Sequence, residues 1–457
     1  MTTRPNLFAP TRRRILQASS YAGITFLFKP TLVFGYAENE KLRMACIGAG
    51  GQAGAGIGPG MSQNLVAIAE VDPDGKGKGN IDKVLKASPD TKIYTDYRQL
   101  FDKHPQLDAV WCGTPDHNHF GASIRALHAG AGVYCEKPLT WSIWEARRIR
   151  EVALAKKAVT QMGNQGHSSG TIREICEHIW AGNLGEVKEV HCISNRNFSA
   201  GDTRPASKPV PKGLDWEAWL GPAPQRDYHD GLHSFSWRGW LDFGSGSLGD
   251  MACHNVDGVV WALKLDQVES FEVEALHDGK VNKPTKEGHA AQALIVYKFP
   301  ARGDMPPVTL TWYHGGKKPE RPAALEEGRP VLSEGSYFIG SKATMSSGSH
   351  CQDTQLIPKK LNDEVGKPKQ VLARSKHGHG GDFIEGCKKK DPNLPTSNFA
   401  YAARLTEIVL AGNLAQAVGE KITYSVKTGK TNNDKANALL KREPRKGWEA
   451  GYEERQV

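Results

Sequence analysis

The chain has 457 residues, of which 39% are hydrophobic and 24% are charged, a composition typical of a globular protein rather than a disordered or fibrous one. This length exceeds what one hydrophobic core usually fills, so we expect two domains. The formal net charge is +9, but five of these charges lie in residues 1–37, which leaves +4 for the rest. Because no basic block is interleaved with aromatic residues, we exclude nucleic acid as a partner.

Residues 1–37 have the pattern of an export signal. The segment 11–17, TRRRILQ, resembles the twin-arginine signal, a mildly apolar segment follows at 18–28, and small residues at 35–37 suit a cleavage site. The apolar segment is too short to cross a bilayer, and no later one is long enough, so we expect no membrane span. We therefore predict a protein exported to the periplasm in its folded state; the alternative is a basic disordered tail.

Residues 41–54 predict a strand that runs into a glycine turn and then a helix. The turn has the arrangement G-x-G-x-x-A, which cradles the pyrophosphate of a dinucleotide. The first glycine makes the turn, the second lets the backbone approach phosphate, and the alanine lets helix pack on strand. The predicted cofactor-binding residues here are Gly48, Ala49, Gly50, Gly51, Gln52 and Ala53. The alternative is a glycine-rich turn without a ligand.

The next strand, 65–72, ends in acidic residues. Glu70 and Asp72 lie 20 and 22 residues after Gly50, where a carboxylate accepts a hydrogen bond from the ribose 2′-hydroxyl. Because a carboxylate there repels a 2′-phosphate, we predict NAD in preference to NADP. Lys76 and Lys78 follow closely and could bind such a phosphate.

Strands and helices alternate from 41 to about 162, which predicts a doubly wound parallel sheet of the Rossmann type, and we assign residues 38–162 to an NAD-binding domain. The predicted strands are 43–47, 65–70, 92–94, 108–112 and 132–135, and the clearest helices are 119–129 and 142–156. Such sheets bind ligands beyond the carboxyl ends of their strands. Two polar loops fall there, GTPDHNH at 113–119 and EKP at 136–138.

These two loops carry candidate chemistry. Lys137, beside a dinucleotide, could stabilise the alkoxide that forms as a hydride leaves an alcohol carbon; the alternative is a lysine on a surface turn. His117 and His119 could be mistaken for metal ligands. A metal site needs further ligands, and because none stands at a plausible spacing we predict no metal.

The second half of the chain has a different pattern, which we assign to an α+β substrate and oligomerisation domain, 163–425, followed by a polar C-terminal arm, 426–457. Alternating strands predict a large, mostly antiparallel sheet. The predicted elements are helices at 169–181 and 399–418 and strands at 186–193, 268–276, 290–299, 307–313 and 336–340. A free face of such a sheet commonly packs on another subunit, so we expect a homodimer or homotetramer. The eight cysteines show no paired spacing, which predicts buried thiols.

The segment 244–254 supplies a second group of candidate residues. If Gly249 opens a helix, Asp250 and His254 share one face and could transfer a proton, with Asp257 orienting the imidazole. The alternative is an aspartate at a helix start and a packed histidine. The long loop 197–246 is rich in tryptophan, and aromatic faces suit carbohydrate. We expect Trp237, Arg238 and Trp240 to form a substrate rim, and Trp216 and Trp219 to lie in the core.

The glycine turn, the segments Thr-Pro-x-His-x-His (114–119) and Glu-Lys-Pro (136–138), and Asp-x-x-x-His (250–254) together resemble the Gfo/Idh/MocA family over about residues 41–450. The resemblance implies that Lys137 lies between nicotinamide and substrate and that Asp250 and His254 are catalytic and bind substrate. It also implies cofactor contacts from residues in three loops: Thr114, Pro115, His117, His119, Glu136, Lys137, Asn164 and Gln165.

We therefore predict an exported NAD-dependent oxidoreductase that transfers a hydride between nicotinamide and a secondary hydroxyl or keto carbon of a sugar or polyol. One alternative is a glycosidase that keeps NAD bound and uses it in a transient cycle of oxidation, elimination and reduction. The Glu-Lys-Pro segment favours the dehydrogenase, since known glycosidases resembling this fold often depart from it. A second alternative is a noncatalytic sugar-binding relative, which the presence of Lys137, Asp250 and His254 disfavours.

Overall fold

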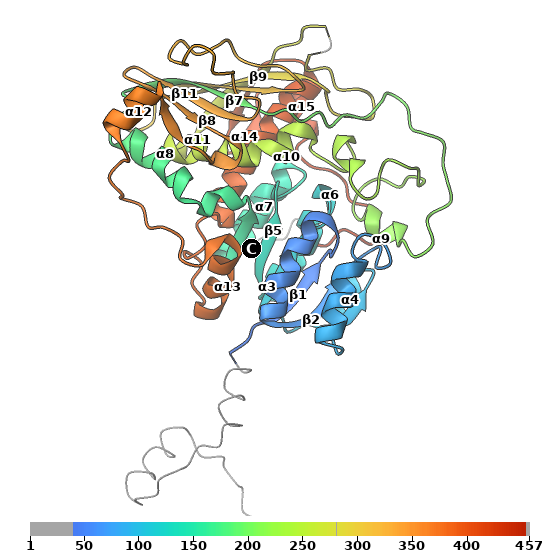
Figure 1. Ribbon diagram of the computed structural model, residues 1–457. Helices are drawn as coiled ribbons and strands as arrows, with labels where there is room; N and C mark the ends of the chain where they lie inside the picture. Colours follow the sequence, from blue (N-terminus) through green and yellow to red (C-terminus); the bar gives the residue numbers. More distant parts are fainter. Residues whose placement is uncertain (1–39, 280, 454–457) are drawn as a thin grey trace, which may run out of the picture. The chain divides into compact units, whose positions relative to one another are not determined.

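The computed structural model describes residues 40–279 and 281–453 (Figure 1). The export signal predicted for 1–37 lies outside these residues, as do the first two residues of the predicted NAD-binding domain. Within the described part of the chain, no helix combines the length and apolarity needed to cross a membrane.

The first half forms a six-stranded parallel sheet in the order β3-β2-β1-β4-β5-β6. Its strands are β1 (Arg43–Ile47), β2 (Asn64–Ala69), β3 (Lys92–Tyr94), β4 (Ala109–Cys112), β5 (Gly132–Glu136) and β6 (Thr160–Gly163). The helices between them are η1 (Gly51–Gly56), α3 (Ile57–Ser62), α4 (Lys78–Ala87), α5 (Tyr97–Lys103), α6 (Asp116–His128) and α7 (Ile143–Ala155).

The central strands β1, β4 and β5 are buried almost throughout, because helices cover the sheet. The five predicted strands are present, each within a residue of its predicted bounds. A sixth strand, β6, was not predicted, since its four residues, TQMG, carry no β-branched apolar side chain. The strand order reverses between β1 and β4, which places the loops after these strands at a topological switch point.

The second half forms a nine-stranded sheet in the order β13-β12-β11-β7-β10-β9-β8-β14-β15, antiparallel except for the β7–β10 pair. Its strands are β7 (Val187–Ile193), β8 (Ser270–Ala275), β9 (Ala293–Phe299), β10 (Val308–His314), β11 (Gly335–Gly340), β12 (Thr344–Ser347), β13 (Gln355–Ile357), β14 (Ile422–Ser425) and β15 (Lys430–Thr431). The predicted fold class, a Rossmann sheet followed by a mostly antiparallel α+β sheet, is confirmed.

Helices and short 3-10 turns accompany this second sheet. They are η2 (Gln165–Ser168), α8 (Gly170–Trp180), α9 (Trp216–Leu220), η3 (Ser236–Gly239), α10 (Gly246–Asn255), α11 (Asp257–Ala262), η4 (Leu265–Gln267), η5 (Ser349–Cys351), α12 (Lys359–Val365), α13 (Gly378–Lys389), α14 (Phe399–Val418) and α15 (Asp434–Ala438). All eight cysteines are buried and free, as the sequence predicts. The domain boundaries at 37, 162 and 425 stay predictions.

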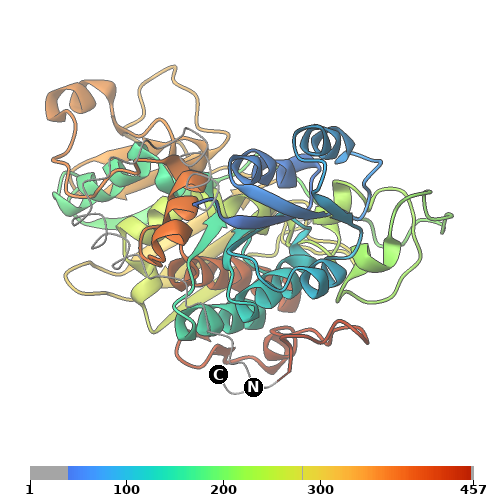
Figure 2. The same cartoon turned by 90° about the horizontal axis from the view of Figure 1, so that it is seen from below.

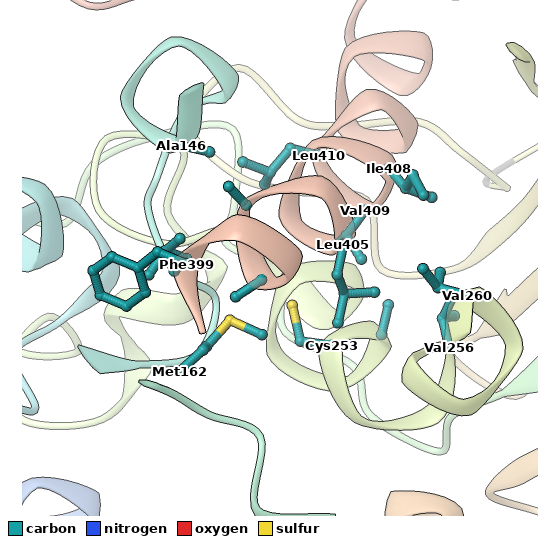
Figure 3. Close-up of a cluster of buried hydrophobic side chains, with 14 of the residues drawn as sticks. Ala146, Met162, Cys253, Val256, Val260, Phe399, Leu405, Ile408, Val409 and Leu410 are labelled. Carbon is teal, nitrogen blue, oxygen red and sulfur yellow. The ribbon is translucent and has the colours of Figure 1, made fainter. Parts of the chain in front are cut away.

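The long helix α14 joins the two sheets through one hydrophobic core. Figure 3 shows its side chains packed between Ala146 of α7, Met162 of β6 and Cys253 of α10. These residues are almost fully buried, and core packing of this kind contributes roughly 25 cal/mol for each Å² of apolar surface removed from water. Helix α10, which carries Asp250 and His254, is thereby fixed relative to the parallel sheet.

Two segments from outside the parallel sheet pack against it and its helices: residues 197–246 and the C-terminal segment. In the segment 197–246, the Asp215 N–H donates to the Val71 carbonyl (2.8 Å) and the Asp215 carboxylate accepts from the Thr95 hydroxyl (2.8 Å). The C-terminal segment runs along α6 and α7 (Figure 2), where Tyr452 contacts the rings of Phe120 and Trp144. The predicted arm therefore packs on its own chain, and part of it, β15, joins the larger sheet.

Candidate active site

The glycine turn is built for close approach between backbones. Gly48 has φ +92, and a Cβ there would lie 2.7 Å from the Ala53 Cβ and 3.3 Å from the Gly113 carbonyl oxygen. At Gly50 a Cβ would lie 3.0 Å from the Gly77 nitrogen. A side chain at Gly48 would clash with the loop after β4, and one at Gly50 would push the glycine turn away from the loop after β2. The turn thus stays narrow and open toward the ligand side of the sheet.

The acids after β2 have different partners. Glu70 is buried, and its Oε2 accepts from the N–H groups of Ala49 (2.7 Å) and Gly50 (3.2 Å), so this carboxylate holds the glycine turn in place. Asp72 Oδ2 lies 3.0 Å from Nε2 of His233, a residue of the 197–246 segment. Both carboxylates line the candidate cavity.

A single cavity of about 410 Å³ joins the glycine turn to helix α10, within the range of roughly 300 to 1,000 Å³ for ligand sites. The predicted site residues that line it come from both halves of the chain: Gly48, Gly50, Gly51, Gln52, Ala53, Glu70, Asp72, Thr114, Pro115, His119, Glu136, Lys137, Gln165, Trp237, Arg238, Asp250 and His254.

A compact ion cluster lies at the α10 side of the cavity. The Lys137 ammonium donates to Asp250 Oδ1 (2.8 Å) and to the Asp250 carbonyl (2.7 Å), and the Arg238 Nε donates to the same Oδ1 (3.1 Å). Burial raises the pKa of Asp250, but Lys137 and Arg238 lower it by more, so the pKa lies below its ordinary value. Asp250 is therefore an anion that fixes Lys137 at the cavity wall.

His254 is one turn of α10 beyond Asp250, and its imidazole is neutral. Burial lowers its pKa well below the ordinary value, and the Lys137 cation lowers it further. Its ring contacts the ring of His350, with centroids 4.0 Å apart and the two planes tilted by 32°. Nδ1 of His254 is buried without a hydrogen-bond partner among the described residues. An unprotonated imidazole at the cavity wall can accept a proton.

Glu136, at the end of β5, is a second titratable group in the cavity. Burial raises its pKa to about 7, although Lys137 opposes the shift. Its Oε1 accepts from Gln52 of the glycine turn at 3.4 Å. Gly163 makes room for this carboxylate, since a Cβ there would lie 2.4 Å from Oε2.

Four predicted site residues do not line the cavity, namely Ala49, His117, Asn164 and Trp240. The His117 ring lies in the core, where Nε2 is 2.7 Å from the Trp219 carbonyl and burial lowers its pKa to about 3. Trp240 packs in the hydrophobic cluster of the 197–246 segment, under the Arg226 guanidinium. Of the three residues expected on the substrate rim, Trp237 and Arg238 line the cavity and Trp240 does not.

Asp257 does not orient His254 as expected. Its carboxylate accepts from Asn164 Nδ2 (2.8 Å) and the Tyr401 hydroxyl (2.7 Å), and it lies 3.0 Å from His167 Nδ1. Helix α10 ends at Asn255 and α11 begins at Asp257, so the chain direction changes between His254 and Asp257. Asp257 and Asn164 therefore belong to a buried network beside β6. Helix α10 also begins at Gly246, three residues before the predicted start.

His119 links the two polar loops. Its Nδ1 lies 2.7 Å from the Pro138 carbonyl and its Nε2 lies 2.8 Å from the Thr114 carbonyl. A ring between two carbonyls can act as a bracket that sets the spacing of the loops after β4 and β5. Gln165 lines the cavity and donates to the Tyr134 hydroxyl at 3.3 Å.

Several cavity residues are not predicted as such from the sequence: Arg196, Phe198, Trp219, His233, Phe235 and His350. Trp219 was assigned to the core, and it both packs there and reaches the cavity. The others stand in irregular segments or turns, where no period in the sequence indicates which way a side chain points. In the described part of the chain, no group of three or more His, Cys, Asp or Glu is arranged to hold a metal ion.

Comparison with known proteins places this architecture in a family. Residues 42–164 match the Gfo/Idh/MocA oxidoreductase family's NAD-binding Rossmann fold, and residues 180–297 match the family's C-terminal alpha/beta domain. Together these regions span more than half of the chain. The chain belongs to the Gfo/Idh/MocA oxidoreductase family.

Two curated relatives match parts of the chain. D-xylose 1-dehydrogenase (NADP(+)) of Hypocrea jecorina is 36% identical over 98 residues, covering 21% of this chain and 25% of that protein. Inositol 2-dehydrogenase of Pseudomonas fluorescens is 33% identical over 131 residues, covering 27% of this chain and 38% of that protein. The chain thus matches well under half the length of either relative.

Solved structures share the fold over most of the chain. An inositol dehydrogenase homolog from Azotobacter vinelandii, complexed with NADH and myo-inositol, has a TM-score of 0.53 at 19% identity and covers 84% of this chain and 97% of its own. The WlbA dehydrogenase from Bordetella pertussis, in complex with NADH and UDP-GlcNAcA, has a TM-score of 0.55 at 15% identity and covers 83% of this chain and 98% of its own.

Proposed function

We propose that this protein is an exported, NAD-dependent dehydrogenase that oxidises a secondary hydroxyl of a sugar or polyol. The observation that carries the proposal is the single cavity in which the glycine turn meets Lys137, Asp250 and His254. Relatives named as xylose and inositol dehydrogenases support the substrate class.

The residues fit a dinucleotide. Gly51 has φ +55 and open space where a Cβ would stand, and Gly48 and Gly50 keep the turn narrow. The Glu136 side chain lines the same cavity, and its buried Oε2 has no hydrogen-bond partner among the described residues. This oxygen is therefore available to a polar group of a bound dinucleotide. A bound nicotinamide would supply the hydride acceptor. Glu70 and Asp72 favour the ribose 2′-hydroxyl of NAD, while Lys76, also on the cavity wall, could meet the 2′-phosphate of NADP.

Each reacting group has a distinct task. Lys137 donates a hydrogen bond to the substrate oxygen and stabilises the negative charge that grows there as the C–H bond breaks. His254, kept unprotonated by burial and by Lys137, accepts the hydroxyl proton. Asp250 remains ionised, holds the lysine, and is itself held by Arg238. The 197–246 segment adds Trp237 to the cavity wall, and an aromatic side chain there contributes apolar surface suited to sugar C–H groups.

Turnover of a sugar panel tests the proposal. Purified, unheated protein is first analysed by mass spectrometry for a retained dinucleotide, and then incubated with NAD or NADP and with free sugars and polyols while NADH formation is followed at 340 nm. Formation of NADH with at least one sugar, lost in Lys137→Ala protein that still binds NAD, is the expected result. Full activity of the Lys137→Ala variant would refute the proposed role of Lys137.

A glycosidase that retains NAD is the second candidate. The observation that favours it is the closure of the glycine-turn side by the 197–246 segment, through the His233–Asp72 and Asp215–Thr95 contacts, since a covered nucleotide dissociates slowly. Aryl glycosides distinguish the two candidates. Release of the aglycone without net NADH formation supports the glycosidase, and net NADH formation supports the dehydrogenase.

We also propose that residues 1–37 direct export to the periplasm by the twin-arginine route and that the protein forms a homodimer or homotetramer. The basis for export is the TRRRILQ segment, and the basis for assembly is the extent of the nine-stranded sheet. Replacing Arg12 and Arg13 by lysine should leave the precursor in the cytoplasm. Light scattering of the mature protein gives the number of subunits, and a monomer would refute the assembly.

A further inference from the structure

His350 enters the cavity from the C-terminal sheet, outside every motif that the sequence offers as a candidate site. It lies in η5, the turn between β12 and β13, and its ring lies beside the His254 ring, with centroids 4.0 Å apart and a tilt of 32°. Lys137, Asp250 and Arg196 are close enough to act electrostatically on this imidazole. A group in this position faces the same space as the residues that act on the reacting hydroxyl.

The backbone of this turn is held in an unfavourable conformation. His350 has φ 60 and ψ 27, and Cys351 has φ 58, which is the left-handed region that non-glycine residues seldom occupy. Two consecutive residues of this kind cost free energy, and such conformations persist where surrounding contacts enforce them, often at functional sites.

The enforcing contacts come from helix α10 itself. The His350 N–H donates to Asn255 Oδ1 (3.0 Å), and the Cys351 thiol donates to the His254 carbonyl (3.3 Å). Asn255 in turn donates to the Ile193 carbonyl at the end of β7 (3.0 Å). A Cβ at Gly166 would lie 2.3 Å from the His350 carbonyl oxygen, so only glycine lets the turn come this close. Hydrogen bonds therefore hold the turn against His254, the candidate base, and its neighbour Asn255.

The imidazole has one nitrogen committed and one free. Nδ1 lies 2.8 Å from the Ser349 hydroxyl, and the described residues offer no hydrogen bond to Nε2. Burial lowers the pKa of His350, with a further lowering by Lys137, so the ring is neutral at neutral pH. A neutral ring anchored at Nδ1 presents a single, oriented hydrogen-bonding atom to a ligand.

We propose that His350 is a substrate-binding residue that hydrogen-bonds the hydroxyl next to the one being oxidised, so that the enzyme selects sugars or polyols with vicinal hydroxyls. The His254 and His350 rings have centroids 4.0 Å apart and are tilted by 32° to each other, so each imidazole can serve one of two neighbouring hydroxyls on a sugar ring. The inference rests on the proposed function and adds the hydroxyl pattern that the substrate must carry.

A cycle that changes enzyme and ligand in turn tests the inference. The dissociation constants of an accepted sugar and of its deoxy analogue, which lacks the hydroxyl beside the reacting carbon, are measured by tryptophan fluorescence on nucleotide-loaded protein. Wild-type protein should bind the sugar about threefold to tenfold more tightly than the analogue, the contribution of one hydrogen bond. In His350→Asn protein the two ligands should bind equally. Asparagine tolerates the left-handed backbone and is too short to replace Nε2.

Controls separate structure from recognition. His277→Ala, a change at an exposed histidine, should keep the wild-type preference, and His350→Ala should behave as His350→Asn provided that its NAD affinity is unchanged. An undiminished preference for the sugar in both His350 variants overturns the inference. Binding with this cycle but without NADH formation would refute the dehydrogenase and leave the role of His350 standing, whereas a failure of every tested sugar to bind would refute both.

Discussion

Replacement of Lys137 by methionine is the sharpest test of the ion cluster. The Lys137 and Asp250 side chains are 12% and 13% exposed and only 2.8 Å apart, so solvent does little to weaken their interaction. Methionine keeps the length of the side chain and removes the charge. Loss of one preorganised donor to a developing oxyanion typically costs about 3–4 kcal/mol, so we expect kcat/KM to fall about 10²- to 10³-fold. Because Arg238 still neutralises Asp250, the fold should survive.

The same variant should move the pH profile in a defined direction. After burial, Lys137 is the largest influence that lowers the pKa of His254, so its removal raises that pKa. A base works only when unprotonated, and its activity is lost as pH falls through its pKa. The acid limb of kcat/KM for sugar oxidation should therefore shift to higher pH in Lys137→Met protein. Lys76→Met, at another lysine on the cavity wall, should not shift it. An unchanged acid limb, or one shifted to lower pH, would refute the electrostatic coupling.

Three further changes have expected outcomes. Glu70→Gln weakens the hold on the glycine turn, which both nucleotides share, and removes the negative charge that repels a 2′-phosphate. NAD affinity should therefore fall roughly ten- to hundredfold and NADP affinity less, measured by fluorescence titration, and equal losses would contradict a ribose role. Asp257→Asn replaces a buried acceptor of three partners and should lower the free energy of unfolding by about 3 kcal/mol in urea, whereas an unchanged midpoint would contradict this. Burial raises the pKa of Glu177, but Arg374 and two backbone N–H groups lower it to about 2, so the stability it contributes is lost as pH falls from 4.5 toward 2. Glu177→Gln should flatten that part of the acid-unfolding curve.

Much of the parallel sheet could be predicted because its determinants are local. The apolar runs, the glycine turn and the acids after β2 follow one another within about thirty residues, and each has a direct structural cause. The prediction that Asp250 and His254 share a helix holds for the same reason, since a spacing of four residues places both on one side of α10. The position of Lys137 at the cavity could be predicted because the residue directly follows the carboxyl end of a parallel strand, where such sheets bind ligands.

Contacts between distant segments could not be predicted in this way. His117 and His119 belong to one short motif, yet one ring packs on Trp219, a hundred residues away, and the other reaches the cavity. Asn164 was expected to contact the cofactor, but its amide donates to Asp257 in a buried network instead. Trp237 and Trp240 are three residues apart, and only the folded path of the 197–246 segment decides which one lines the cavity. These outcomes depend on tertiary packing, for which one sequence carries no local signal.

The site's two tasks are divided between different parts of the chain. The groups proposed to act on the reacting hydroxyl are fixed by rigid elements: Lys137 follows β5, Asp250 and His254 lie on α10, and α14 packs against both halves. The groups that would read the rest of the substrate, such as Phe235, Trp237 and His350, come from an irregular segment and a turn. Such segments tolerate substitution better than core helices and strands do. Relatives that share this fold can therefore differ in substrate by changing these segments while the lysine, aspartate and histidine stay in register. Substitutions in 197–242 other than at Arg238, which holds Asp250, should alter sugar preference before they alter the pH dependence set by Lys137.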